Sequence, residues 1–227
     1  MIEKRPSINP GLSTVQQVFD WLHDMILRGK LLPGARLSES EIAGQVGVSR
    51  QPVREAFIRL AGQGLAEIRP QRGTFIGRIS VREVLAVRTI REGVESDIVR
   101  KVASAPPADF EDRMRAQIAR QRQIVAEGDM GGFIELDNLF HRSFAIAAEQ
   151  EDVWKRIEQL TAQMNRLRHL SVQVFDPAGL VDQHEAILDA VLQGDAQQAE
   201  AAIRHHLRRV LDDLPQTITT RPELFTD

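Results

Sequence analysis

The sequence predicts a mainly α-helical protein, with three helices and a β-hairpin followed by a six-helix antiparallel bundle. Apolar residues recur at helical spacing from residue 14 onward, and strand-like patterns are confined to residues 65–76. Glycine and proline divide the rest into helical segments whose short connections favour antiparallel neighbours. We therefore divide the 227 residues into a module at 1–78 and a helical domain at 79–227, each long enough to bury a core.

Three helices are predicted in the first module. The first covers residues 14–29, where apolar side chains repeat at helical spacing up to Gly29. Ser38 and Glu41 form a capping-box pattern for the second helix, which Gly47 ends. Ser49 is a favourable N-cap for the third. Residues 65–76 then predict two short strands around a turn.

Long helical patterns replace the strand signals after residue 80. The six predicted helices cover roughly residues 80–103, 108–127, 131–148, 151–174, 179–193 and 196–214. The tail after Pro215 is polar, and we expect it to be loosely ordered.

The composition excludes several classes of protein. With no cysteine, the chain has no disulfide scaffold, no cysteine-ligated zinc finger and no thiol nucleophile, so any metal must bind His, Asp or Glu. The sequence shows no signal peptide and no apolar run long enough for a membrane span. We expect a cytoplasmic, soluble protein without a membrane partner.

The net charge of -3 conceals two unlike parts. Residues 1–78 hold 11 Lys and Arg against 7 Asp and Glu, a net of +4, and the remaining residues carry a net of -7. Such asymmetry is typical of a nucleic-acid-binding module joined to another domain, although random surface charge is an alternative.

The second and third helices, joined at Gly47, have the arrangement of a helix-turn-helix, whose second helix enters the major groove of DNA. The third helix begins at Ser49, and its exposed face starts with Arg50, Gln51 and Arg54. These side chains can contact base edges or phosphates, and the backbone N–H groups of the helix start can bind a phosphate.

Further candidates for DNA contact flank this helix pair. Arg36 precedes the second helix, and Arg72 and Gly73 lie in the hairpin turn, where a glycine lets the backbone approach a groove closely. The alternative is that the arginines form a solvated helix face in a module used for protein contacts.

The segment from Arg36 to Ile76 resembles the winged helix-turn-helix of the GntR family of bacterial transcription regulators, above all in the run VSRQPVREAFIRLAGQGL. The resemblance implies that Arg36, Arg50, Arg54 and the wing turn at Arg72 and Gly73 contact double-stranded operator DNA. Gln51 stands where many members carry Thr, which puts its base contact in doubt.

The helical domain places an acid and several histidines on the apolar faces of its helices. Asp137 and His141 lie one turn apart on the apolar face of one helix. His184 and His206 share the apolar faces of two others, whereas His205 points outward. Three imidazoles and a carboxylate suit a divalent metal such as zinc, nickel or manganese, although a histidine on an apolar face is often a core residue.

Four segments of this domain, REGVE, FIELDNLFH, QHEAILDAVLQGDAQQAE and IRHHL, resemble the FCD effector-binding domain of the FadR subfamily, and six helices suggest the VanR-like branch. The resemblance implies a metal, zinc above all, on Asp137, His141, His184 and His206. It also implies a small carboxylate or sugar acid as effector. Arg91 matches a basic position that could pair with the carboxylate of this metabolite, and an ion pair with Glu95 is the alternative.

Together these features predict a one-component transcription regulator, a homodimeric repressor by family precedent, that is not an enzyme. Two alternatives remain open at this point. The metal could activate water for hydrolysis, although Glu185 lies on the outward side of its helix and no second carboxylate is evident as a general base. The metal could also be purely structural, with the bundle serving only for dimerisation.

Overall fold

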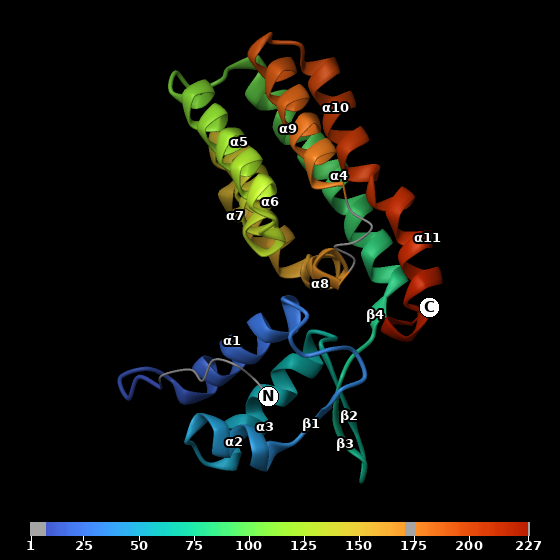
Figure 1. Cartoon of the computed structure of the whole chain (residues 1–227). Helices are drawn as coiled ribbons and strands as arrows, with labels where there is room; N and C mark the ends of the chain where they lie inside the picture. Colours follow the sequence, from blue (N-terminus) through green and yellow to red (C-terminus); the bar gives the residue numbers. More distant parts are fainter. Residues whose placement is uncertain (1–7, 171–175, 227) are drawn as a thin grey trace.

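The computed structural model describes residues 8–170 and 176–226. It consists of an N-terminal module, a helical bundle and a helix, α8, that lies between them (Figure 1). The mainly helical fold class predicted from the sequence is confirmed.

The N-terminal module contains the three predicted helices and the predicted hairpin. Its elements are α1 (Thr14–Leu27), β1 (Arg36–Leu37), α2 (Glu39–Val46), α3 (Arg50–Gly62), β2 (Ala66–Arg69) and β3 (Gly73–Ile76). Ser38 caps α2 by accepting a hydrogen bond from the Glu41 N–H, as the capping box predicts. Ser49 occupies the N-cap position of α3, but its side chain makes no capping hydrogen bond.

The hairpin is part of a three-stranded antiparallel sheet in the order β1-β3-β2, which the sequence did not predict. Arg36 pairs with Phe75, and Leu37 pairs with Thr74. A strand of two residues is too short to show an alternating pattern. Its pairing places Arg36 beside the wing, close to the start of α2.

The bundle contains α4 (Val81–Ser104), α5 (Phe110–Glu127), α6 (Met130–Ala147), α7 (Glu151–Leu160), α9 (Pro177–Leu192), α10 (Ala196–Arg208) and α11 (Val210–Thr220), and α8 (Ala162–Leu170) lies between the bundle and the N-terminal module (Figure 1). The prediction of one helix over 151–174 was wrong within the described residues, because α7 and α8 are separate; residues 171–174 lie outside them. At the break, both the N–H and the hydroxyl of Thr161 donate to the carbonyl of Glu158. This tightened turn directs α8 out of the bundle.

The predictions of one helix over 196–214 and of a loosely ordered tail after Pro215 were also wrong, because the chain forms two helices there, α10 and α11, that are divided at Arg209. Pro215 lies inside α11, which buries Leu214 and Thr217. A 3₁₀ turn (Pro222–Leu224) then leads to β5 (Phe225–Thr226), which pairs in parallel with β4 (Ile79–Ser80). The tail thus packs against the chain segment that enters α4, because its few apolar residues find a partner there.

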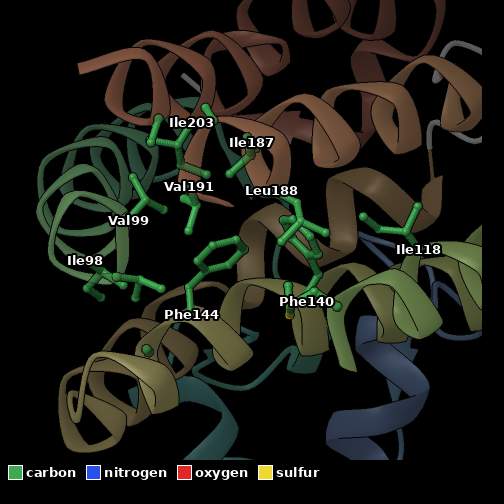
Figure 2. Packing of buried hydrophobic residues seen from close by; sticks show 14 of the residues in the cluster. Ile98, Val99, Ile118, Phe140, Phe144, Ile187, Leu188, Val191 and Ile203 are labelled. Atoms are coloured by element: carbon green, nitrogen blue, oxygen red, sulfur yellow. The ribbon is translucent and has the colours of Figure 1, made fainter. Parts of the chain in front are cut away.

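The core of the bundle joins residues from α4, α5, α6, α7, α9 and α10. Figure 2 shows Phe140 and Phe144 of α6 between the aliphatic side chains of the neighbouring helices. The rings of Phe140 and Phe144 meet edge to face at 5.1 Å. No helix in the described part of the chain is long and apolar enough to cross a membrane.

A separate apolar cluster lies where the chain leaves the module and enters the bundle. It contains Ile79 of β4, Leu167 of α8, Leu214 of α11 and Phe225 of β5. Ala162 of α8 packs against the apolar core of the N-terminal module itself, and Arg28 of α1 forms an ion pair of 2.6 Å with Glu135 of α6. The two parts are therefore connected by packed side chains as well as by the chain itself.

Candidate functional site

The bundle brings the four predicted metal ligands together. Asp137 and His141 come from α6, His184 from α9 and His206 from α10, and one ligand atom of each lies within 4.8 Å of those of the others. Asp137 and His184 are fully buried, and the other two are 2% and 3% exposed. His205 is exposed, as its position on the outer face predicts.

An oxygen atom lies beside the Nδ1 atom of each histidine. His141 Nδ1 is 2.6 Å from Glu95 Oε2. His184 Nδ1 is 2.7 Å from Gln121 Oε1, and His206 Nδ1 is 3.0 Å from Gln183 Oε1. When Nδ1 carries the proton, each Nε2 atom presents a lone pair.

The Nε2 atoms and the carboxylate then face one another. The Nε2 atoms of His141 and His206 are 3.2 Å apart, and His184 Nε2 lies 3.5 Å from Asp137 Oδ1. Among the described residues, His184 Nε2 has no hydrogen-bond partner although it is buried. Converging lone pairs and an orphaned buried nitrogen are what a divalent cation would satisfy, so the donor set fits a metal.

The electrostatics of the cluster lower the pKa values of Asp137, His184 and His206. Burial, together with the neighbouring His184 and His141, lowers the pKa of His206 well below its usual value. Burial also lowers the pKa of His184, and Asp137 opposes that shift. Burial alone would raise the pKa of Asp137, but Arg168 and the histidines hold it well below its usual range. Metal binding at neutral pH therefore needs little proton release from these three ligands.

Arg91 forms the predicted alternative, a buried ion pair with Glu95, with Nε 2.6 Å from Oε1. The pair raises the pKa of Arg91, against the effect of burial. Arg91 also lines a cavity of about 20 Å³ beside His206, together with Arg88, Arg168 and Arg209. Arg91 thus pairs with the carboxylate that contacts His141, and it also lines the cavity next to the cluster.

The predicted DNA contacts gather on one side of the N-terminal module. Arg36, Arg50, Arg54 and Gly73 line one surface groove, and Glu39 lies between the arginines. Ser49, Gln51 and Arg72 are exposed outside this groove. Gln51 donates to Glu55 on its own helix at 2.8 Å, so its amide is engaged within α3.

Glu39 is a residue of this surface that the sequence reasoning missed. Its carboxylate accepts hydrogen bonds from Arg50 Nη2 and Arg54 Nε, each at 2.9 Å. The two arginines lower the pKa of Glu39. The side chain of Arg50 remains 66% exposed, and that of Arg54 remains 58% exposed. Only its place in the first turn of α2, eleven residues before Arg50, could have suggested this contact.

The helix α8 touches both parts of the protein. Gln163 Nε2 donates to the Gly64 carbonyl at 3.2 Å, and Arg166 Nη2 donates to the Gly77 carbonyl at 2.6 Å. On the same helix, Arg168 donates to both oxygens of Asp137, at 2.5 and 3.3 Å. One short helix therefore joins a predicted metal ligand to the turn and linker of the N-terminal module.

Sequence reasoning missed the groups that surround the predicted metal ligands. Gln121 carried a signal, since it is a polar residue on the apolar face of α5 that includes Met114 and Ile118. Arg168 and Gln183 carried none, because nothing in their neighbourhood indicates which helix they will meet.

The outward position predicted for Glu185 agrees with the structure, where it pairs with Arg122 and Arg115 on the surface. Glu95, the carboxylate next to His141, is held by Arg91. Neither acid is placed as a free general base beside the cluster.

Two family models match the chain. Residues 14–76 match "Bacterial regulatory proteins, gntR family", and residues 86–209 match the FCD domain. The HTH-type transcriptional repressor RspR of Escherichia coli is 33% identical over 97% of both chains. A probable D-xylose utilization operon transcriptional repressor of Paenarthrobacter nicotinovorans is 29% identical over 88% of both chains.

Solved structures show the same fold. The Escherichia coli McbR/YncC structure superposes with a TM-score of 0.74 at 23% identity, covering 90% of this chain and 98% of that one. A putative GntR regulator from Rhodococcus reaches a TM-score of 0.71 at 26% identity, with coverages of 90% and 99%.

Proposed function

The chain belongs to the gntR family of bacterial regulatory proteins and is a DNA-binding transcription regulator with an FCD domain, and we propose that a small carboxylate bound beside a metal in this domain controls its affinity for operator DNA. The observation that carries the proposal is the position of α8, which contacts both the metal-ligand cluster and the DNA-binding module.

The proposed metal ligands are Asp137, His141, His184 and His206. Nitrogen and carboxylate donors without cysteine suit zinc, with nickel or manganese as other candidates. When bound, the metal would supply positive charge and open coordination positions for an anion or water. Gln121, Gln183 and Glu95 would orient the three imidazoles.

The proposed effector site is the cavity beside His206. Four arginines line it, which favours an anionic ligand. Its volume of about 20 Å³ in this arrangement admits a group the size of a water molecule, so the effector would have to widen it. Arg91 stays a candidate for contact with the effector, although its guanidinium is already paired with Glu95.

DNA recognition is proposed to use Arg36, Ser49, Arg50, Gln51, Arg54, Arg72 and Gly73. Six of them lie at the start of α3 or at the turn of the wing, and Arg36 lies on the neighbouring strand β1, which supports docking of α3 in the major groove. A homodimer would present two such helices to two half-sites of an operator. Because two relatives are named as repressors, we propose that this chain also represses.

The test begins with an operator selected from genomic fragments by the purified, zinc-loaded protein. A panel of small carboxylic acids is then screened for a change in operator affinity by fluorescence anisotropy. We expect the active acid to act on the zinc-loaded protein and to lose its effect after chelation. An acid that acts equally on both forms would contradict a binding site beside the metal.

Thermal unfolding distinguishes the alternative of a purely structural metal. If chelation lowers the melting temperature but leaves the effector response of operator binding intact, the metal only supports the fold. We expect the response to disappear as well, because the effector would share the metal.

A further inference from the structure

Arg168 is the cation that satisfies Asp137 in this structure. Its Nη1 and Nη2 atoms lie 2.5 and 3.3 Å from the two oxygens of a carboxylate that is fully buried. The Arg168 side chain is itself only 11% exposed, and it lines the cavity beside His206. A charge-assisted bidentate pair of this kind is strong when little water reaches it.

This pairing competes with a metal for the same ligand. The Oδ2 atom that accepts from Arg168 also lies 3.8 Å from His141 Nε2, on the inner side of the cluster. A divalent ion among the four ligands would take the negative charge of Asp137 and would repel a guanidinium that stayed in contact with the same carboxylate. The Arg168–Asp137 pair must therefore weaken when the metal enters.

The other three arginines that line the cavity do not pair with a candidate metal ligand. Arg91 pairs with Glu95 at 2.6 Å, and Arg88 pairs with Glu92 at 2.5 Å. Arg209 has its nearest carboxylates at 3.7 and 3.8 Å. Neither Arg88 nor Arg91 depends on a metal ligand for its partner. Arg168 alone among these four would lose its partner to the ion.

We propose that Arg168 exchanges partners: it holds Asp137 in the metal-free protein, and a bound divalent metal releases it to bind a carboxylate ligand in the adjacent cavity. Metal and carboxylate then favour each other's binding, since each stabilises the arrangement that the other needs. The inference rests on the proposed metal site and specifies how that site would select an anion.

The exchange also accounts for how a larger ligand enters. The guanidinium of Arg168 forms part of the wall of a cavity of about 20 Å³, so its departure from Asp137 reshapes that space. The same helix carries Gln163 and Arg166, which hold Gly64 and Gly77 of the N-terminal module and its linker. Arg168 therefore changes its partner on α8, the same helix that contacts the DNA-binding module.

The test measures zinc affinity of the full-length protein by competition with a chromophoric chelator, with sodium acetate or sodium chloride at equal ionic strength. The acetate–zinc complex is calibrated with the dye alone. We expect acetate to tighten zinc binding by the wild type several-fold. Arg168→Gln should bind zinc about tenfold more tightly than the wild type in chloride, because the competing pair is gone, and acetate should add little.

Arg100→Gln is the matched control, since it also removes one arginine that pairs with a carboxylate of a neighbouring helix, here Glu200, but Arg100 does not line the cavity. Its zinc affinity in chloride should equal that of the wild type. If Arg168→Gln does not fold without zinc, Arg168→Lys keeps a cation but loses the bidentate contact, and its zinc affinity in chloride should still exceed that of the wild type.

The proposed exchange would be overturned if the Arg168 variants bound zinc as tightly as the wild type in chloride, or more weakly. It would also be overturned if acetate left the zinc affinity of the wild type unchanged. A wild type that binds no zinc at all would instead overturn the proposed metal site itself. The two failures are therefore distinguishable.

Discussion

Arg166 offers the sharpest test of how α8 connects the two parts of the protein. It is fully buried, and the described residues place no carboxylate against it. Burial lowers its pKa to about 10. Relative to the ordinary value of 12.5, the charged form is disfavoured by about 3 kcal/mol in the folded protein. The interaction with the linker must compensate for this cost.

We predict that Arg166→Met changes global stability little. The variant recovers the cost of the buried charge, but it loses the charged hydrogen bonds to the Gly77 carbonyl and to Gln163 Oε1, at 2.6 and 2.9 Å. Leaving such acceptors buried without a partner costs about 1–3 kcal/mol each. The opposing contributions are of similar size, so we expect a net change within about 2 kcal/mol, or less than about 8 °C in melting temperature.

The linker should respond far more than the melting temperature. Gly77 donates its own N–H to the Leu65 carbonyl at 3.0 Å, next to the carbonyl that Arg166 holds. Hydrogen exchange followed by mass spectrometry should therefore show faster exchange at this amide in Arg166→Met, and the zinc response of operator binding should shrink.

Arg122→Met serves as the control. Arg122 pairs with Asp182 on the surface, and both residues are far from the linker in the sequence. A melting temperature lowered by more than about 10 °C, with unchanged exchange at Gly77, would refute the reasoning. Arg166 would then be a support of the core rather than a link to the DNA-binding module.

Four further predictions follow from the site and from its surroundings. His206→Ala should abolish zinc binding measured by mass spectrometry, whereas the exposed His205→Ala should retain it; the reverse would contradict the assigned cluster. Arg54→Ala should weaken operator binding by more than about 1 kcal/mol in anisotropy titrations, because it removes a base or phosphate contact. Glu39→Gln should instead raise affinity for unrelated DNA and reduce the ratio of specific to non-specific binding; unchanged ratios would show that Glu39 does not restrain the arginines. Hydrogen bonds from Arg208 and Arg204 hold the pKa of Glu92 at about 2, below its usual value of 4.5. The ionised Glu92 therefore contributes its full share to the free energy of unfolding above about pH 5, and this share is lost as the pH falls toward 2. Between pH 5 and pH 3, the free energy of unfolding measured in urea titrations should fall by about 1 kcal/mol less in Glu92→Gln than in the wild type. Equal losses would contradict this assignment.

The apolar faces of the helices carried enough information to predict which residues form the buried cluster of candidate metal ligands. Asp137, His141, His184 and His206 each share a face with core residues, so their inward direction follows from helical spacing alone. The separation of His206 from His205 follows from the same rule. That these side chains meet depends on how three helices pack, which no local pattern specifies.

The features that spacing could not predict are those that join distant segments. The break at Thr161 has neither glycine nor proline to mark it, so one helix was predicted where the chain turns into α8. The sequence predicts that helical structure ends at Pro215, but burial of Leu214 and Thr217 compensates for the backbone hydrogen bond that proline cannot make. Both errors concern the region between the module and the bundle.

The most direct test of the account compares the operator affinity of the zinc-loaded and the chelated wild type at one salt concentration. Coupling between two sites is worth about 1–3 kcal/mol, so we expect the two affinities to differ by about fivefold or more, and His206→Ala to show no difference. Equal operator affinities for the zinc-loaded and zinc-free wild type, with zinc bound at the cluster, would contradict the claim that this site controls DNA binding.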